Sequence, residues 1–293
     1  MPNRFVALVA GLLLGVIVAT PLAVWAQNKP KVTWPDVNWK KPETNKPAPK
    51  HNIAGSWSTA GGPDEGTQAG GVQLHPNNGK PENNPPYTAH GLELYKQAKP
   101  TEGINLVPPA QQNDPRNLCE PLGFPRWNHY SLRFTRIFQD DAKVEILYHW
   151  NNVWRTIWID GRPLPKLVDG GVEVDGEFRE QRWMGYSVGK WLDDNTLEVQ
   201  TVGTMPEDRV WLDNTGRPVS DKVVTTERFR RVNNDTLEWS TTINDPVMYT
   251  RPWDTMKFTM KLQDINVDEN ENICSPRLYR EYNEAFGNAA SGQ

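Results

Sequence analysis

Apolar and polar residues alternate along much of this chain in short runs, and one phrase occurs twice about forty residues apart. Residues 194–201 and residues 234–241 each begin with a polar turn and continue as a run in which apolar and polar positions alternate. Each copy also follows another alternating run. Two alternating runs joined by a short polar turn are typical of a β-hairpin. The repeat therefore predicts two successive hairpins.

Further alternating runs extend this pattern over most of the chain. Strands are predicted at residues 52–57, 130–138, 143–150, 153–160, 176–184, 187–191, 196–203, 223–231, 236–244 and 255–262. Asn151-Asn152 tolerates positive φ and should join two of them as a hairpin. One short helix is predicted before the main strands, at residues 88–98, with Thr88 as its cap and Pro100 beyond its end. This spacing indicates an antiparallel meander that forms a sandwich or a barrel.

The N-terminus has the pattern of a secretion signal. Arg4 supplies a positive charge, residues 5–22 form an apolar stretch broken by Pro21, and Ala26 provides a small residue at a cleavage site. We therefore expect a periplasmic or secreted protein. The alternative is an uncleaved anchor, because the apolar segment approaches the length that spans a bilayer.

Composition divides the remaining chain into three parts. Residues 27–50 are rich in Pro and Lys and form an arm or linker, which could reach a protein partner through Trp34 and Trp39. Residues 51–264 contain the strand signals and are predicted to form the β domain, and residues 265–293 form an acidic C-terminal tail. The signal peptide is assigned to residues 1–26.

The chain has two cysteines, Cys119 and Cys274, and neither has a second cysteine or a histidine at the spacing of metal ligands. In an oxidising compartment such a pair most often forms a disulfide, which we predict here. No metal and no cofactor are expected. A composite site that includes His129 and His149 remains an alternative, because these histidines lie on strands expected to be neighbours.

The net charge is −4 and no basic block stands out, so nucleic acid is a poor candidate partner. The chain has 13 tryptophans, many on or beside predicted strands, and such side chains form either a filled core or the walls of a cavity. Alternatively, tryptophan side chains on an outer face could stack on carbohydrate rings. We predict a ligand site formed by Tyr148, Trp150, Arg155, Trp158, Trp183, Tyr186 and Arg228, with the two arginines as inward polar anchors.

No run of residues specifies a reaction. Residues 185–189 match the nucleophile-elbow pattern G-x-S-x-G, but the serine lies between two predicted strands, whereas that elbow requires a strand-to-helix turn. An enzyme of the hydrolase or isomerase type remains an alternative, with Asp160, His149, Tyr186 or Glu227 as acid or base. Asp160, Glu227 and Arg228 fall within strand signals, where an inward charge either orients a ligand or forms a structural pair.

Two sets of phrases carry a resemblance to a known family. Gly55-Ser56-Trp57 has the G-x-W form found at the start of lipocalin-like barrels. The more specific phrases are Asp160-Gly161-Arg162-Pro163, Met184-Gly185 with Ser187 and Gly189, residues 194–201, Trp211-Leu212-Asp213 with Gly216, Ser220-Asp221, residues 227–231, and Asp245-Pro246 with residues 249–253. Over residues 52–274 the chain resembles a family of uncharacterised exported bacterial proteins, which implies a lipocalin-like β-barrel.

The chain departs from that family at three places where its members commonly carry histidine, or in the second case histidine or aspartate. Leu164, Tyr186 and Val219 stand there in this sequence. If those side chains form a metal or catalytic site in the relatives, this chain has lost it. The favoured function is therefore an exported protein that binds a small apolar or aromatic ligand in a β-barrel. The alternatives are an enzyme that uses the same cavity and an accessory subunit of an exported assembly.

Overall fold

A computed structural model describes residues 46–59, 71–129, 135–264, 273–282 and 284–285 of the chain. All of them belong to one compact unit, Lys40–Gln293. The predicted signal peptide and most of the predicted arm lie outside the described residues. Among the described residues, no helix has the length and apolar character needed to cross a membrane.

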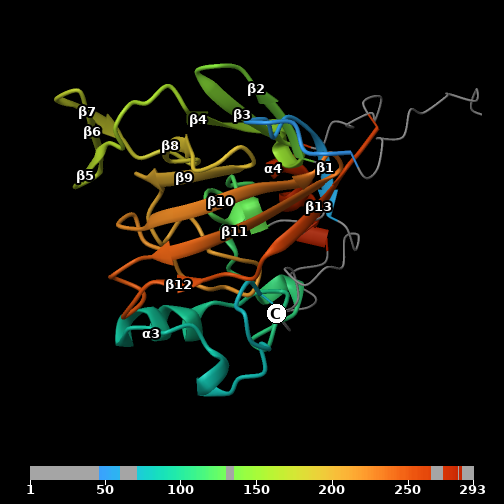
Figure 1. The fold of residues 1–293 in the computed structure, drawn as a ribbon. Coiled ribbons are helices and arrows are strands. Elements are labelled where there is room, and N and C mark those ends of the chain that lie inside the picture. The colour runs from blue at the N-terminus through green and yellow to red at the C-terminus, as the bar shows by residue number, and fades with distance from the viewer. Residues whose placement is uncertain (1–45, 60–70, 130–134, 265–272, 283, 286–293) are drawn as a thin grey trace, which may run out of the picture. The chain divides into compact units, whose positions relative to one another are not determined.

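Nine strands close into a barrel, as the fold prediction required (Figure 1). They are β1 (Gly55–Thr59), β2 (Thr135–Gln139), β3 (Lys143–Tyr148), β4 (Val153–Trp158), β8 (Tyr186–Trp191), β9 (Thr196–Val202), β10 (Val224–Asn233), β11 (Thr236–Asn244) and β13 (Phe258–Leu262). The first and last of these pair, with Trp57 opposite Leu262. The pairing of β10 with β11 completes the ring.

Both predicted hairpins are present, as β8–β9 and β10–β11. Alternation places Leu197 and Leu237 in the core with no exposed surface. Phe229 lies opposite Trp239, and their ring centroids are 5.8 Å apart. Because successive strand residues face opposite sides of a sheet, the inward positions of these hairpins form one wall of the core.

One barrel pairing is parallel, because β4 and β8 run in the same direction. The chain between them forms a separate three-stranded sheet of β5 (Lys166–Val168), β6 (Gly171–Val174) and β7 (Glu177–Glu180), visible at the upper left of Figure 1. The sequence predicted a single strand at residues 176–184. The small sheet was missed because its strands are short and β7 has no buried side chain to mark a face.

Residues 122–129, before β2 begins, contribute Leu122 and Trp127 to the barrel core. This segment includes the 3₁₀ helix η4 (Arg126–His129), all of which is buried. The Phe124 ring lies 4.1 Å from the Arg155 guanidinium, and the Trp127 and Tyr148 ring centroids are 5.4 Å apart. The side chains of this segment therefore occupy interior space that would otherwise be available to a ligand.

The predicted helix is present as α3 (Ala89–Gln97), and the Thr88 side chain caps it by accepting a hydrogen bond from Gly91 N. Near this helix a second core, separate from the barrel core, gathers around Tyr249 and Trp253. The remaining elements are η1 (Pro81–Asn83), η2 (Pro109–Gln111), η3 (Pro115–Leu118), η5 (Trp150–Asn152), β12 (Trp253–Asp254) and α4 (Pro276–Tyr282).

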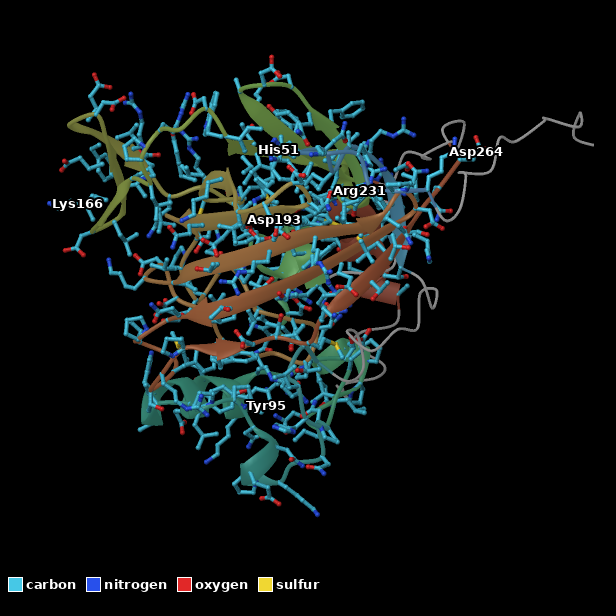
Figure 2. The ribbon with its side chains drawn as sticks, viewed as in Figure 1. His51, Tyr95, Lys166, Asp193, Arg231 and Asp264 are labelled. Atoms are coloured by element: carbon cyan, nitrogen blue, oxygen red, sulfur yellow. A yellow bond between two sulfur atoms is a disulfide. The ribbon has the colours of Figure 1, made fainter. Side chains whose placement is uncertain are left out.

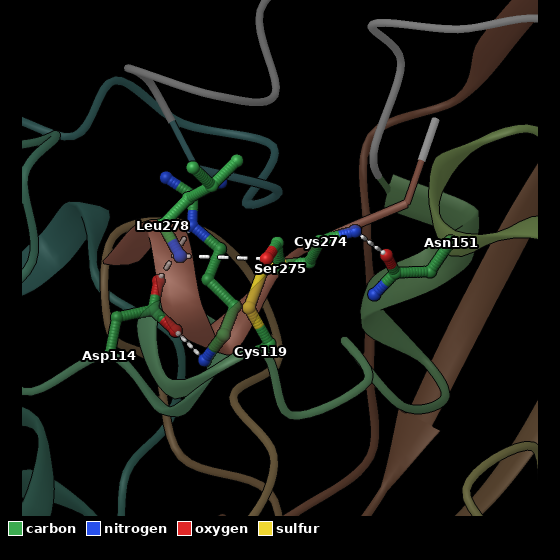
Figure 3. Close-up of a disulfide and its surroundings, with 7 residues drawn as sticks. Asp114, Cys119, Asn151, Cys274, Ser275 and Leu278 are labelled. Carbon is green, nitrogen blue, oxygen red and sulfur yellow. Dashed lines mark hydrogen bonds and ion pairs between the residues drawn. A yellow bond between two sulfur atoms is a disulfide. The ribbon is translucent and has the colours of Figure 1, made fainter. Parts of the chain in front are cut away.

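The predicted disulfide joins Cys119, at the end of η3, to Cys274, just before α4 (Figure 3). Their Cα atoms are 5.5 Å apart, within the usual range for a disulfide. Cys274 N also donates to Asn151 Oδ1 at 2.6 Å, and Leu278 N donates to Ser275 Oγ. These contacts tie the start of α4 to the barrel side of the unit.

Candidate functional site

A pocket of about 250 Å³ lies between β4 and the segment that leads into β8. Its walls are Trp154, Arg155, Thr156, Trp158, Arg182, Trp183, Met184, Gly185, Tyr186 and Ser187. We call it the aromatic pocket. Four of the predicted ligand-site residues border it, namely Arg155, Trp158, Trp183 and Tyr186.

The parallel pairing explains where the aromatic pocket forms. β4 and β8 share only two paired positions, at Ile157–Trp158 of β4 and Ser187–Val188 of β8. Residues before these positions are unpaired on that side of each strand. The pocket occupies this gap in the barrel wall, so side chains from the outer face, such as Trp154, and from the inner face, such as Arg155, both reach it.

Arg155 is buried at the inner side of the pocket and is fully engaged. Its Nε donates to Ser187 Oγ at 3.0 Å, its Nη2 to Thr201 Oγ1 at 2.8 Å, and its Nη1 to Glu227 Oε1 at 3.1 Å. Burial disfavours its charge, but the carboxylate of Glu227 holds the pKa of Arg155 above its usual value. The positively charged Arg155 side chain is therefore held in place at the buried end of the pocket.

The same network continues inward and accounts for Tyr148. Asn128 donates to Glu227, and the Tyr148 hydroxyl donates to Asn128 Oδ1 at 2.5 Å. Burial raises the pKa of Tyr148, so the phenol stays protonated. Tyr148 thus belongs to the barrel core and does not border the aromatic pocket. The side chain of Trp150 lies outside the described part of the structure.

The predicted inward anchor Arg228 is wrong. Its side chain is 60% exposed on the outer face, where Nη2 lies 3.0 Å from Glu198 Oε2. The neighbouring residue Glu227 points inward in its place, with no exposed surface. Adjacent residues of a strand face opposite sides of the sheet, so an error of one residue in register exchanges the inward and outward side chains. The sequence-based prediction therefore chose Arg228 where Glu227 is the inward charge.

Arginine side chains fix the aromatic walls. The Arg162 guanidinium lies 3.6 Å from the Trp158 ring centroid, and its Nη1 donates to the Tyr186 hydroxyl at 3.1 Å. On the other wall, the Arg209 guanidinium lies 4.8 Å from the Trp183 ring centroid. Cation–π contacts of this kind hold a ring in one orientation. The pocket walls are therefore ordered without a ligand.

Six residues of the pocket were absent from the predicted site, among them Trp154 and the charged residue Arg182. Arg182 is exposed, and its guanidinium lies 5.6 Å from the Tyr186 ring centroid. Within the described residues no carboxylate pairs with it, in contrast to Arg155 and Arg162. The only sequence signal was its position directly before Trp183. It gives the pocket a positive charge that is open to an anionic group.

A neighbouring pocket of about 510 Å³ lies between the barrel and the small sheet and shares Tyr186. Asp160 borders it too, so two of the four candidate acid–base residues meet here. Hydrogen bonds from Arg162, at 3.0 Å from Nε and 2.6 Å from Nη2, lower the pKa of Asp160. A carboxylate held in this way is a weak general base.

His149 and Glu227 border neither of these two pockets, so the four candidate acid–base residues do not converge. His129 lies in the barrel interior, with its Nδ1 3.2 Å from the Leu212 carbonyl oxygen. Among the described residues, no three His, Cys, Asp or Glu side chains are grouped to hold a metal ion. Comparison with protein-family models, with curated proteins and with solved structures finds no match to this chain.

Proposed function

We propose that this protein is an exported binding protein whose aromatic pocket holds a small aromatic ligand. The observation that carries the proposal is the convergence of Trp154, Trp158, Trp183 and Tyr186 on one gap in the barrel wall. Trp154 is 67% exposed, and a tryptophan is seldom left so open on a soluble protein without a binding role. Arg182 favours a ligand that carries a negative charge.

The size and rigidity of the site support the same class of ligand. Ligand pockets usually have volumes of about 300–1,000 Å³. The aromatic pocket, at about 250 Å³, therefore suits a molecule of one or two rings. Because Arg162 and Arg209 already hold Trp158 and Trp183, little side-chain freedom is lost on binding. Such preorganisation favours recognition of a flat ring.

The proposed periplasmic or secreted location rests on the signal pattern of residues 1–26. The disulfide supports it, because structural disulfides persist in oxidising compartments. The resemblance to exported bacterial proteins is part of the same proposal.

Tryptophan fluorescence tests the binding function directly. The protein is titrated with benzoate, phenylacetate and indole-3-acetate, and with the neutral compounds benzamide and indole. Quenching or a spectral shift that saturates is expected, and the acids should bind more tightly than the neutral compounds. If no compound changes the emission, the proposal fails.

Two variants locate the binding. Trp183→Ala should weaken binding of every compound by about tenfold, as expected for loss of a buried aromatic contact. Arg182→Gln should remove only the preference for acids. Arg179→Gln, which changes an exposed arginine of β7, and Trp253→Phe, in the second core, are the matched controls and should leave binding unchanged. Equal effects in variants and controls would contradict the assignment to this pocket.

A further inference from the structure

A second polar cluster is built around Asp213 and Arg217, beside the second core. Asp213 is 1% exposed and accepts hydrogen bonds from Val72 N at 3.0 Å, from Thr215 N at 2.9 Å and from Arg217 Nη1 at 2.7 Å. Thr215 Oγ1 also donates to it, so both carboxylate oxygens are used. Tyr95 of α3 lies next to this cluster, and Lys166 borders the 510 Å³ pocket described above. Figure 2 shows these two residues far apart.

Arg217 is buried but only half satisfied. Its Nη1 bonds to Asp213 and Thr215, while its Nε and Nη2 have no hydrogen-bond partner among the described residues. These two nitrogens form one edge of the guanidinium, and such an edge receives a carboxylate or phosphate through two parallel hydrogen bonds. Arg162 uses the same edge, Nε and Nη2, to hold Asp160 in this chain.

A further unpaired polar side chain lies close to the Arg217 guanidinium. Gln73 is 5% exposed, and neither its amide oxygen nor its amide nitrogen has a partner. A Cβ placed on Gly71 would lie 1.9 Å from Arg217 Nη1 and 2.7 Å from Gln73 Oε1, so the two side chains meet at this glycine. Because Gly71 has no side chain, Arg217 Nη1 and Gln73 Oε1 can pack against the backbone there, on the Nη1 side of the guanidinium.

Two tyrosines complete the cluster. The Arg217 guanidinium lies 5.5 Å from the Tyr95 ring centroid, and the Tyr87 ring stacks on Tyr95 at 5.4 Å. Both hydroxyl groups are buried, the Tyr87 hydroxyl beside Arg217 and the Tyr95 hydroxyl beside Asn77 and Thr215. Burial raises the pKa of each tyrosine, so both remain proton donors. Asn77, whose amide is also unpaired, lies near Tyr95.

The balance of donors and acceptors indicates what the cluster is suited to hold. Each unsatisfied buried polar group destabilises the folded state, so a set of them in one place favours an occupant. Arg217 contributes only donors, and Asp213 already accepts hydrogen bonds at both oxygens, whereas the amides of Gln73 and Asn77 each leave a donor and an acceptor unpaired. An occupant rich in acceptor oxygens would satisfy the excess donors.

We propose that this cluster is a binding site for an oxoanion, the carboxylate or phosphate group of a small molecule, held by the free Nε–Nη2 edge of Arg217. Gln73, Tyr87 and Tyr95 provide the surrounding donors. A surface pocket of about 410 Å³ lies between Pro85 and Trp253, and Gln73 is the residue of this cluster that borders it. The site is independent of the aromatic pocket.

Thermal unfolding of the full chain in acetate, phosphate and chloride, at equal ionic strength and pH 7, tests this proposal. At least one oxoanion should raise the melting temperature above its value in chloride, in a manner that saturates with concentration. An effect of acetate alone identifies a carboxylate site, and an effect of phosphate alone identifies a phosphate site. If neither exceeds chloride, the proposal is overturned.

Substitutions assign the effect to the cluster. Arg217→Lys keeps the positive charge beside Asp213 but removes the two-nitrogen edge, and should weaken the apparent affinity by about tenfold or more. Tyr95→Phe keeps the stacked ring, removes one donor and should weaken it severalfold, which decides the matter if Arg217→Lys does not fold. Arg230→Lys, on the outer face of β10, is the matched control. Oxoanion stabilisation that persists unchanged in Arg217→Lys or in Tyr95→Phe would overturn the assignment.

Discussion

Arg155 of β4 and Glu227 of β10 form an ion pair inside the barrel, with 1% and 0% of their side chains exposed. Their strands are not neighbours, because β8 and β9 lie between them in the sheet. The pair therefore joins two separated parts of the barrel wall. It also fixes the floor of the aromatic pocket, where Arg155 is one of the lining residues.

Breaking this pair should be strongly destabilising. Glu227→Gln leaves the Arg155 charge buried without its counter-charge, and should lower the free energy of unfolding by about 3–5 kcal/mol in urea titrations. The double variant Arg155→Met/Glu227→Leu should show a smaller decrease in the free energy of unfolding, because no uncompensated charge remains.

The adjacent pair on the outer face gives the matched control. Arg228→Gln removes one of the two cations beside Glu198 and leaves Lys190, and surface pairs contribute only about 0–1 kcal/mol. Equal losses for Glu227→Gln and Arg228→Gln would show that burial does not govern the strength of the Arg155–Glu227 pair.

Stability should fall in mild acid because of His129. Burial lowers the pKa of this histidine to about 4, whereas the unfolded chain retains a value near 6.5. Between these values the unfolded state binds more protons, so the free energy of unfolding decreases as the pH falls. The expected loss from this group between pH 7 and pH 5 is about 2 kcal/mol, measured by urea unfolding at each pH.

His129→Gln should flatten this part of the pH profile, because the substituted side chain does not titrate. His90→Gln, an exposed histidine on α3, is the comparison and should retain the full slope. A slope that is the same in all three proteins would assign the acid sensitivity to other groups.

The disulfide should contribute substantially to stability, since Cys119 and Cys274 are separated by 155 positions in the sequence. Cross-linking so distant a pair restricts the unfolded chain, and removal typically costs about 2–5 kcal/mol. The double variant Cys119→Ala/Cys274→Ala should therefore have its unfolding midpoint at a lower urea concentration. A reducing agent should destabilise the parent protein but leave the double variant unaffected, and any other result would contradict this role.

Gly91 should not tolerate a methyl group. A Cβ there would lie 2.2 Å from the backbone oxygen of Met248, so alanine would force α3 away from the second core. Overpacking of this kind typically costs about 1–3 kcal/mol. His90→Ala, at the exposed neighbouring position, tests whether a change in α3 alone has this effect, and should alter the melting temperature little. Equal stability of Gly91→Ala and the parent would show that the helix can shift freely.

Local pattern predicted the elements in which one face is buried. The hairpins β8–β9 and β10–β11 follow from period-two alternation, and α3 follows from its cap at Thr88 and the stop at Pro100. The hairpin of β3 and β4 forms with positive φ at Asn151 and Asn152, as expected, but its loop covers residues 149–152 and not these two residues alone. In each case the information lies within a few consecutive residues.

The pattern could not predict features that arise from packing between distant segments. Residues 122–129 show no periodicity, and their burial comes from contacts with strands much later in the chain, such as the bond from Asn128 to Glu227. The aromatic pocket was only partly foreseen, because its location depends on the short parallel pairing of β4 with β8. Which of Glu227 and Arg228 faces the barrel interior depends on the register of β10 in the sheet.

The pairing of Trp57 with Leu262 sets a requirement on how this molecule is made. β1 finds its partner strand about two hundred positions later in the sequence, so no fragment released before Leu262 can complete the ring. Such a fragment would present bare strand edges, which invite pairing with other copies and precipitation. Premature termination anywhere upstream of β13 should therefore yield insoluble material, and folding must wait until almost the whole polypeptide has emerged.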